Sequence, residues 1–243
     1  MTGARQSREV PVLRDLLRHD PSPLDPLTVT IDHLFSLYPG RSGAILSPRP
    51  PQPDGVSVLG ESRRARLRGR LVEVWLALWS ARQETDVTLS HLVEAARVSA
   101  DYRDVVEDVA RLDADSRARL TADVRSHLVV LRETLGSLPP RLQVDLAVRR
   151  RLWLAGDRGE LRVRIDAVLS LPTRRVLLDV TTSPLGEEVE SLALVALADL
   201  AVGQRPSRIA RISTANGDVR VLDVNDQLVD LAITTLQNRL EAA

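Results

Sequence analysis

The sequence contains neither cysteine nor lysine. The absence of cysteine excludes disulfide bonds, thiolate zinc sites, iron–sulfur clusters and cysteine nucleophiles. Because lysine is absent, all 33 basic residues are arginine, which excludes Schiff-base chemistry and a phosphate-loop lysine. Arginine does not replace lysine where a compact or titratable donor is required.

Aromatic residues and long apolar segments are also scarce. Aromatic side chains make up 2% of the chain, so the stacking platforms of single-strand-binding proteins are not expected. No apolar run reaches the ~20 residues of a membrane-spanning helix. Residues 1–6 are not followed by the apolar core of a secretory signal. We therefore expect a cytoplasmic protein with no membrane partner.

Positive and negative charges balance over the chain. Its 243 residues include 33 basic and 33 acidic ones, so no global field attracts the protein to nucleic acid. Hydrophobic residues make up 44% of the chain, an ordinary value for a globular protein. This length is sufficient for one large domain or two small ones.

Proline content and helical periodicity organise the first half of the chain. Residues 1–26 are expected to form an N-terminal arm, with one short helix over residues 10–18 that the prolines at 21, 23 and 26 interrupt. The remaining residues, 27–243, are expected to form one domain whose helical half is 27–138. Thr30 is the expected N-cap of a short helix that ends before a proline-rich loop. Apolar spacing predicts further helices at 63–81, 89–98, 102–112 and 115–135.

The hydrophobic pattern changes from helical to alternating in the sheet-containing half, 139–243. The first predicted strand carries apolar side chains that are expected to share one face: Leu142, Val144, Leu146 and Val148. Further strands are predicted at 161–167, 176–180, 209–213 and 219–223, with helices at 187–202 and 225–242. Asn216-Gly217 is a strong signal for a hairpin turn between the last two strands. The order of elements indicates an α/β (α+β) fold.

Two aspartates stand at predicted strand ends. Asp166 follows Val163-Arg164-Ile165, and Asp179 follows Val176-Leu177-Leu178. The segment between them predicts a hairpin, which would place both carboxylates on adjacent strands. Two carboxylates and a backbone carbonyl suit Mg²⁺ or Mn²⁺, and such an ion activates water and stabilises charge on a phosphodiester. The alternative is that both carboxylates are solvated or paired with arginine.

These segments resemble a known family. Val163-Arg164-Ile165-Asp166 and, after a turn, Leu178-Asp179-Val180-Thr181 resemble the GRID…(D/E)xK signature of RecB-type nucleases in the PD-(D/E)XK superfamily. Arg68-Gly69-Arg70-Leu71-Val72-Glu73 resembles the upstream helix of that family, and the element order over 27–243 is similar. The resemblance implies a restriction-endonuclease-like core, with a mixed five-stranded sheet flanked by helices. The motifs themselves are degenerate.

The resemblance also implies a site. Asp166, Asp179 and the backbone carbonyl of Val180 would be metal ligands. Glu73 occupies the position of the family's histidine and would be a further ligand. Thr181 occupies the position of the family's lysine, and threonine has no charge with which to orient or activate water. The catalytic positions are then Asp166, Asp179 and Thr181, with Mg²⁺ or Mn²⁺ as the cofactor if the site functions.

Arginines gather at the start of the upstream helix and beside the aspartates. They are expected either to hold a phosphate backbone or to form the solvated start of an amphipathic helix, balanced by Glu61 and Glu73. The triplet Arg149-Arg150-Arg151 is a second candidate contact. The residues assigned to nucleic-acid binding are Arg63, Arg64, Arg66, Arg68, Arg70 and Arg164.

Three functions remain open at this point. The first is a degenerate nuclease fold that binds DNA or acts as a scaffold in repair, recombination or phage defence, with a protein partner in a larger DNA-processing complex. The second is an active Mg²⁺-dependent DNA nuclease that uses Glu73, Asp166 and Asp179 without the lysine. The third is a protein-interaction module with no nucleic-acid role, which would need an exposed apolar patch.

Overall fold

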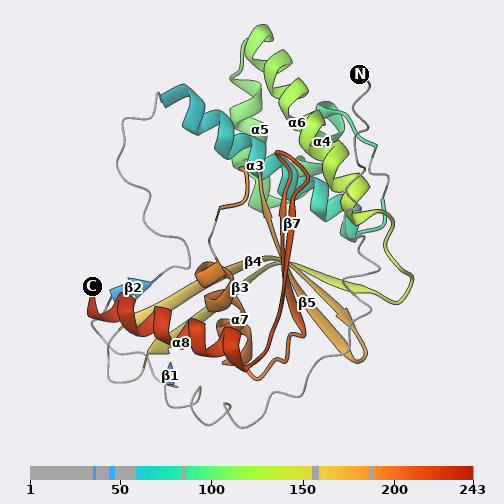
Figure 1. The fold of residues 1–243 in the computed structure, drawn as a ribbon. Coiled ribbons are helices and arrows are strands. Elements are labelled where there is room, and N and C mark those ends of the chain that lie inside the picture. The colour runs from blue at the N-terminus through green and yellow to red at the C-terminus, as the bar shows by residue number, and fades with distance from the viewer. Residues whose placement is uncertain are drawn as a thin grey trace, which may run out of the picture.

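The structure is a computed structural model, and it describes strands at residues 35–36 and 44–46 and the segments 59–83, 86–154, 159–186 and 189–242. The predicted arm, residues 1–26, lies outside the described residues. The described part contains six α-helices and a mixed sheet, which make an α+β fold with a helical N-terminal half (Figure 1).

The helical half packs its apolar stripes into one core. Its elements are α3 (Leu59–Ser80), α4 (Leu89–Arg97), a 3-10 turn (Ala100–Tyr102), α5 (Arg103–Ala110) and α6 (Ala114–Leu135). The predicted stripe on α3 is buried, and Trp75 and Trp79 stack there with ring centroids 6.4 Å apart. Asp113 caps α6 by accepting a hydrogen bond from the backbone N–H of Ser116 at 2.7 Å.

The sheet-containing half is built on five long strands. They are β3 (Gln143–Leu154), β4 (Gly159–Leu171), β5 (Arg174–Thr181), β6 (Arg208–Ser213) and β7 (Val219–Asp223). Neighbouring strands are antiparallel except β5 and β6, which are parallel. The helix α7 (Val189–Leu200) connects these two, and α8 (Asp226–Glu241) closes the described fold. The hairpin predicted at Asn216-Gly217 joins β6 and β7.

The prediction of a short helix after Thr30 is wrong at the residues that the structure describes there. Phe35–Ser36 form strand β1, which pairs with the end of β3, and Ala44–Leu46 form strand β2, which pairs with the start of β4. A helix of so few residues is marginal by itself, whereas each of these strands completes the ladder of a longer one. Tertiary pairing therefore overrides the local pattern.

The β3–β4 hairpin, which we call the ribbon, serves two cores. Its part near β5 places Val144 and Leu146 against the helical half, whereas its outer part places Val148 and Leu152 against α7 and α8. The prediction that Leu142 to Val148 share one face is therefore wrong. The change of face occurs at Ala147, whose φ of 50° lies in the left-handed region. A residue in that conformation breaks the regular alternation of a strand.

The end of α3 is tied to the segment that enters β3. Trp79 Nε1 donates to the carbonyl of Gly136 at 2.8 Å. Arg82, with a φ of 58°, donates to the carbonyls of four residues: Leu138, Pro139, Pro140 and Leu142. These bonds satisfy carbonyls in a segment that has no helix or sheet partner for them.

We expect Arg82→Ala to lower the free energy of unfolding by about 1–2 kcal/mol, because several carbonyls lose a charged donor. Arg82→Lys should recover only part of this loss, since a single ammonium group does not span the four carbonyls. Chemical denaturation measures both values. The control is Arg97→Ala, which removes one exposed arginine from α4. Equal effects of Arg82→Ala and Arg97→Ala would contradict the role of the Arg82 contacts.

Candidate functional site

The two aspartates meet where β5 leaves β4. The antiparallel ladder between these strands ends at the pair Ala167 and Leu178, so the next step brings Asp166 opposite Asp179. Beyond this point β5 continues along β6. The backbone N–H of Val180 then donates to Asp166 Oδ2 at 2.8 Å. Where β5 separates from β4, the side chain of Asp166 therefore accepts a hydrogen bond in place of a backbone carbonyl of β4. The two aspartates lie on adjacent strands, as the predicted hairpin implied.

Asp179 is held by an arginine from β6. Arg211 lies opposite Asp179 in the parallel register, and its Nε donates to Asp179 Oδ2 at 2.5 Å. Each of the two side chains is only 9% exposed. A buried carboxylate requires such a charged partner, and removal of the partner alone would leave an uncompensated charge.

Glu73 reaches the same place from α3. Arg164 Nη2, on the ribbon, lies 2.8 Å from Glu73 Oε2, and Arg70 also donates to that oxygen. The guanidinium of Arg70 stacks 4.9 Å from the centre of the Tyr102 ring. Glu73 is close enough to Asp166 to act on its charge. The structure therefore places Glu73 within electrostatic reach of Asp166, and it pairs Glu73 and Asp179 with arginines.

The environment of Asp166 favours its protonated form. Burial raises the pKa of Asp166 to about 7, and the negative charges of Asp179 and Glu73 act in the same direction. The N–H of Val180 and the positive charge of Arg164 oppose this rise in pKa. Asp166 thus changes its charge near neutral pH.

We expect the pKa of Asp166 to make stability depend on pH. Because the folded carboxyl has a pKa of about 7 against 3.8 for the ordinary group, the folded state binds more protons between these values and loses stability as pH rises. Asp166→Asn keeps an acceptor for Val180 and removes the charge. It should therefore raise the free energy of unfolding at pH 8 by at least about 1 kcal/mol, the equivalent of one pKa unit.

Denaturation at pH 4 and at pH 8 measures this effect. The gain from Asp166→Asn should be small at pH 4 and large at pH 8, and Asp145→Asn on the exposed side of β3 controls for the change in net charge. A gain of the same size at both pH values would show that the pKa of Asp166 is not raised.

The arrangement of donors does not fit a divalent ion as it stands. Arginines already occupy the carboxylates of Glu73 and Asp179, and Asp166 accepts from the backbone. Within the described residues, no three His, Asp or Glu side chains form a group able to hold a metal ion. Mg²⁺ or Mn²⁺ at these residues and at the carbonyl of Val180 would require the arginines to move away.

Thr181 takes part in a hydrogen-bond chain to the helical half. Its carbonyl accepts from the hydroxyl of Thr214 at 3.1 Å, and that hydroxyl lies 2.7 Å from Nδ1 of the buried His127. Burial lowers the pKa of His127, which favours the neutral ring. His127 therefore has a structural role in linking α6 to the end of β5, and Thr181 contributes no charge to the site.

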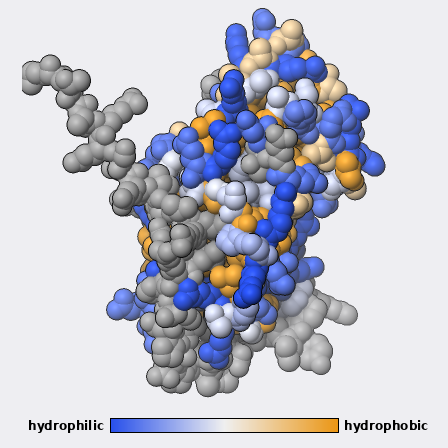
Figure 2. Space-filling view, turned by 90° about the vertical axis from the view of Figure 1, so that its right-hand side faces the viewer, coloured by the Kyte–Doolittle hydropathy of each residue, from blue (hydrophilic) through white to orange (hydrophobic). Residues whose placement is uncertain are grey.

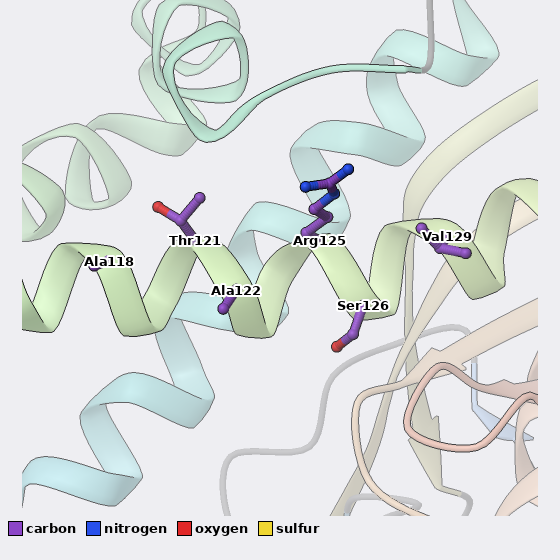
Figure 3. Close-up of a pocket in the computed structure, with 6 residues that line it drawn as sticks. All are labelled: Ala118, Thr121, Ala122, Arg125, Ser126 and Val129. Atoms are coloured by element: carbon purple, nitrogen blue, oxygen red, sulfur yellow. The ribbon is translucent and has the colours of Figure 1, made fainter.

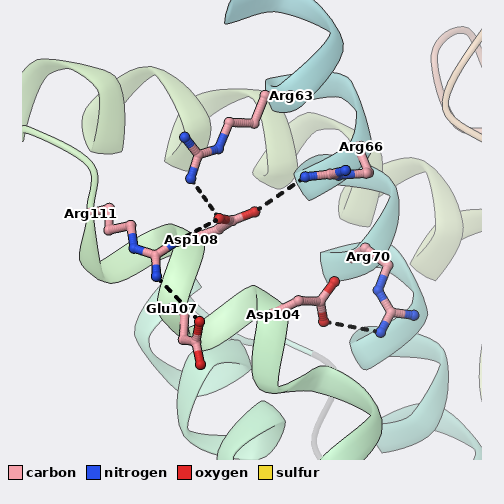
Figure 4. A network of polar contacts seen from close by, with 7 residues as sticks. All are labelled: Arg63, Arg66, Arg70, Asp104, Glu107, Asp108 and Arg111. Atoms are coloured by element: carbon pink, nitrogen blue, oxygen red, sulfur yellow. Dashed lines mark hydrogen bonds and ion pairs between the residues drawn. The ribbon is translucent and has the colours of Figure 1, made fainter.

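Most arginines of the α3 cluster contact acidic residues of their own chain. Arg63 and Arg66 approach Asp108 on α5 at 2.6 and 3.7 Å, and Arg70 approaches Asp104 at 3.2 Å (Figure 4). Arg68 lies 3.7 Å from Asp123 on α6. The sequence paired this cluster with Glu61 and Glu73 of α3 itself. Arg70 does contact Glu73, whereas Arg63, Arg66 and Arg68 contact the helices packed against α3.

The arginine triplet of β3 is divided between the two faces of the strand. Arg150 points to the α7 side, where it and Arg175 bind the fully buried carboxylate of Asp199 at 2.8 and 2.7 Å. Arg149 and Arg151 lie on the exposed side. Sequence reasoning did not find Arg211 or Arg162. The alternating arginines of β3 and β4 were the signal for Arg162, whereas no local pattern marks Arg211.

A shallow hollow lies elsewhere, along the outer side of α6. It is lined by residues of that one helix (Figure 3): Ala118, Thr121, Ala122, Arg125, Ser126 and Val129. Arg125 is the charged side chain of this set, and no carboxylate or histidine belongs to it. The hollow therefore offers no acid, base or metal ligand for chemistry.

Comparison with known proteins finds solved structures of low sequence identity, among them the following two. No family model and no curated protein matches the chain. The crystal structure of SSO0001 is 16% identical with a TM-score of 0.32, and the match covers 75% of this chain and 88% of that chain. The crystal structure of protein VC1899 from Vibrio cholerae is 16% identical with a TM-score of 0.26, covering 76% and 57% respectively. TM-scores this low do not establish a shared fold.

None of the helices in the described segments combines the length and the apolar character needed to cross a membrane.

Proposed function

We propose that this protein is a degenerate nuclease-like domain that binds DNA, or serves as a scaffold on it, without cleaving it. The observation that carries the proposal is the pairing of the acidic site with arginines, Arg211 on Asp179 and Arg164 on Glu73. A guanidinium stays charged at all physiological pH values and cannot act as a general base. Such a site retains affinity for phosphate and lacks a group that activates water.

The likeness of Val163-Arg164-Ile165-Asp166 and Leu178-Asp179-Val180-Thr181 to the PD-(D/E)XK signature supports the nuclease-like part of this proposal. In such a core the two acidic residues lie on adjacent strands beside a mixed sheet, as Asp166 and Asp179 do here. Thr181 in place of the lysine supports the loss of cleavage. A role in DNA repair, recombination or phage defence, beside a protein partner, is part of the same proposal.

One observation favours the active enzyme as a second candidate. The negative charge of Asp179 disfavours ionisation of Asp166, and a divalent ion would relieve that repulsion. This candidate requires Mg²⁺ or Mn²⁺ to displace arginines from Glu73 and Asp179.

The interaction-module alternative needs a large exposed apolar patch. The large hydrophobic side chains exposed in the described segments are Val98 and Val202, on separate elements. On the face shown in Figure 2, hydrophobic areas are small and interspersed with hydrophilic ones. This surface favours a charged partner over an apolar one.

A cleavage and binding assay tests the proposal. Linear single- and double-stranded DNA is incubated with the protein and Mg²⁺, then with Mn²⁺, beside Asp179→Ala and Asp166→Asn. We expect wild type to retard both DNAs in a gel shift at low salt and to leave them intact with either metal.

Degradation that depends on the metal and is lost in both variants would establish the active nuclease instead. Asp166→Asn is included because removal of Asp179 takes away the buried carboxylate that Arg211 binds, which threatens folding. Circular dichroism of each variant confirms that a loss of activity is not a loss of structure. Wild-type protein that neither cleaves nor retards DNA at low salt would contradict both nucleic-acid functions.

A further inference from the structure

The outer part of the ribbon carries a block of arginines on one face. In the β3–β4 register Arg149 lies opposite Arg164, and Arg151 lies opposite Arg162. Opposed residues of antiparallel strands point to the same side, and like charges so placed repel each other. Folding alone does not require this arrangement, because the hydrophobic face of the ribbon is already buried against α7 and α8.

Two residues at the tip of the ribbon fix the block in place. Trp153 lies opposite Glu160, beyond the arginine pairs. The buried carboxylate of Glu160 accepts from Nε and Nη2 of both Arg151 and Arg162, with Nε to Oε1 distances of 2.6 and 2.5 Å. Hydrogen bonds from Arg162 and Arg151 hold the pKa of Glu160 below its usual value. Arg151 also stacks on Trp153 at 4.7 Å.

The arginine side chains remain exposed to solvent although ion pairs fix their positions. The side chains of Arg151, Arg162 and Arg164 are 59%, 51% and 39% exposed, and Arg149 is exposed as well. Arg151 and Arg162 each use Nε and Nη2 for Glu160, which leaves their Nη1 groups outside these bonds. The block therefore combines fixed positions with available donors and an excess of positive charge.

We propose that this face of the ribbon is a track for the phosphates of a nucleic-acid strand, which it guides toward Asp166 and Asp179. The inference rests on the proposed function and names the surface that performs it. Arginines two apart on a strand are about 7 Å apart along it, so the block offers a repeated row of phosphate donors. Arg164, at the inner end of the row, contacts Glu73 and lies within electrostatic reach of Asp166.

The position of the ribbon in the fold also determines how it would contact a nucleic-acid strand. The other face of the ribbon is buried, so the ribbon cannot enter a major groove as a free two-stranded element would. The aromatic ring of Trp153 already stacks on Arg151. We therefore expect contacts with phosphates and none with base edges, which gives binding that is independent of sequence and strongly dependent on salt.

The test compares three double variants that each remove two positive charges. Arg149→Gln/Arg162→Gln changes the ribbon, Arg64→Gln/Arg66→Gln changes the α3 cluster, and Arg119→Gln/Arg125→Gln changes exposed positions on α6. Fluorescence anisotropy measures the Kd of a labelled random-sequence DNA duplex, and of one of its strands, from about 50 to about 200 mM salt.

We expect the ribbon variant to bind the duplex roughly tenfold more weakly, and its plot of log Kd against log salt to lose about two units of slope, one for each phosphate contact. The α6 variant should match wild type in both. A ribbon variant that matches the α6 variant, or a loss confined to the α3 variant, would overturn the track and leave DNA binding in place. Wild type without affinity at low salt would overturn the proposed function, and the track with it.

Discussion

The hydrogen bond from the N–H of Val180 to the carboxylate of Asp166 is the interaction on which the candidate site depends. At this point β5 stops pairing with β4 while it continues beside β6. An N–H left without an acceptor in this partly buried place would cost about 1–3 kcal/mol. The carboxylate of Asp166 supplies this acceptor where β4 and β5 separate. The need to satisfy the N–H of Val180 therefore also places a second acidic side chain beside Asp179.

The ribbon changes its face at the same level of the sheet. Ala147 precedes Val148, whose partner in the register is Ile165, so its left-handed conformation lies across from Asp166. Beyond it the apolar side chains turn to α7 and α8, and Arg149 and Arg151 turn outward. A single irregular residue thus allows one hairpin to contribute to two cores and to expose its charged side next to the acids. The change of face in the ribbon and the exposure of its charged side therefore both follow from the conformation of Ala147.

The balanced composition of the chain conceals an uneven distribution of charge. Arginines of α3 contact the acidic side chains of α5 and α6, and Arg150 and Arg175 share the buried Asp199. In the described part of the outer ribbon, Arg151 and Arg162 share the carboxylate of Glu160. A net charge of zero therefore argues against long-range attraction of nucleic acid, but it does not exclude a local phosphate surface.

Much of this fold follows from the sequence, because apolar residues repeat with a clear spacing in helices and strands of this length. The hairpin at Asn216-Gly217 and the adjacency of Asp166 and Asp179 also follow from local segments. The change of face at Ala147 does not, since an alternating pattern assumes one side for the whole strand. The pairing of Asp179 with Arg211 depends on a parallel neighbour that is distant in sequence, and local pattern does not specify it.

The absence of lysine restricts the basic partners of these carboxylates to arginine. A lysine at the position of Thr181 would place one compact charge beside Asp179, where it would orient water. The arginines that are present instead spread their charge over a plane, form paired bonds with carboxylates and phosphates, and do not titrate. Arg164 combines both roles, since it contacts Glu73 and belongs to the exposed ribbon face. In the function proposed above, such a site holds a phosphate backbone beside neutralised acids and does not activate a nucleophile.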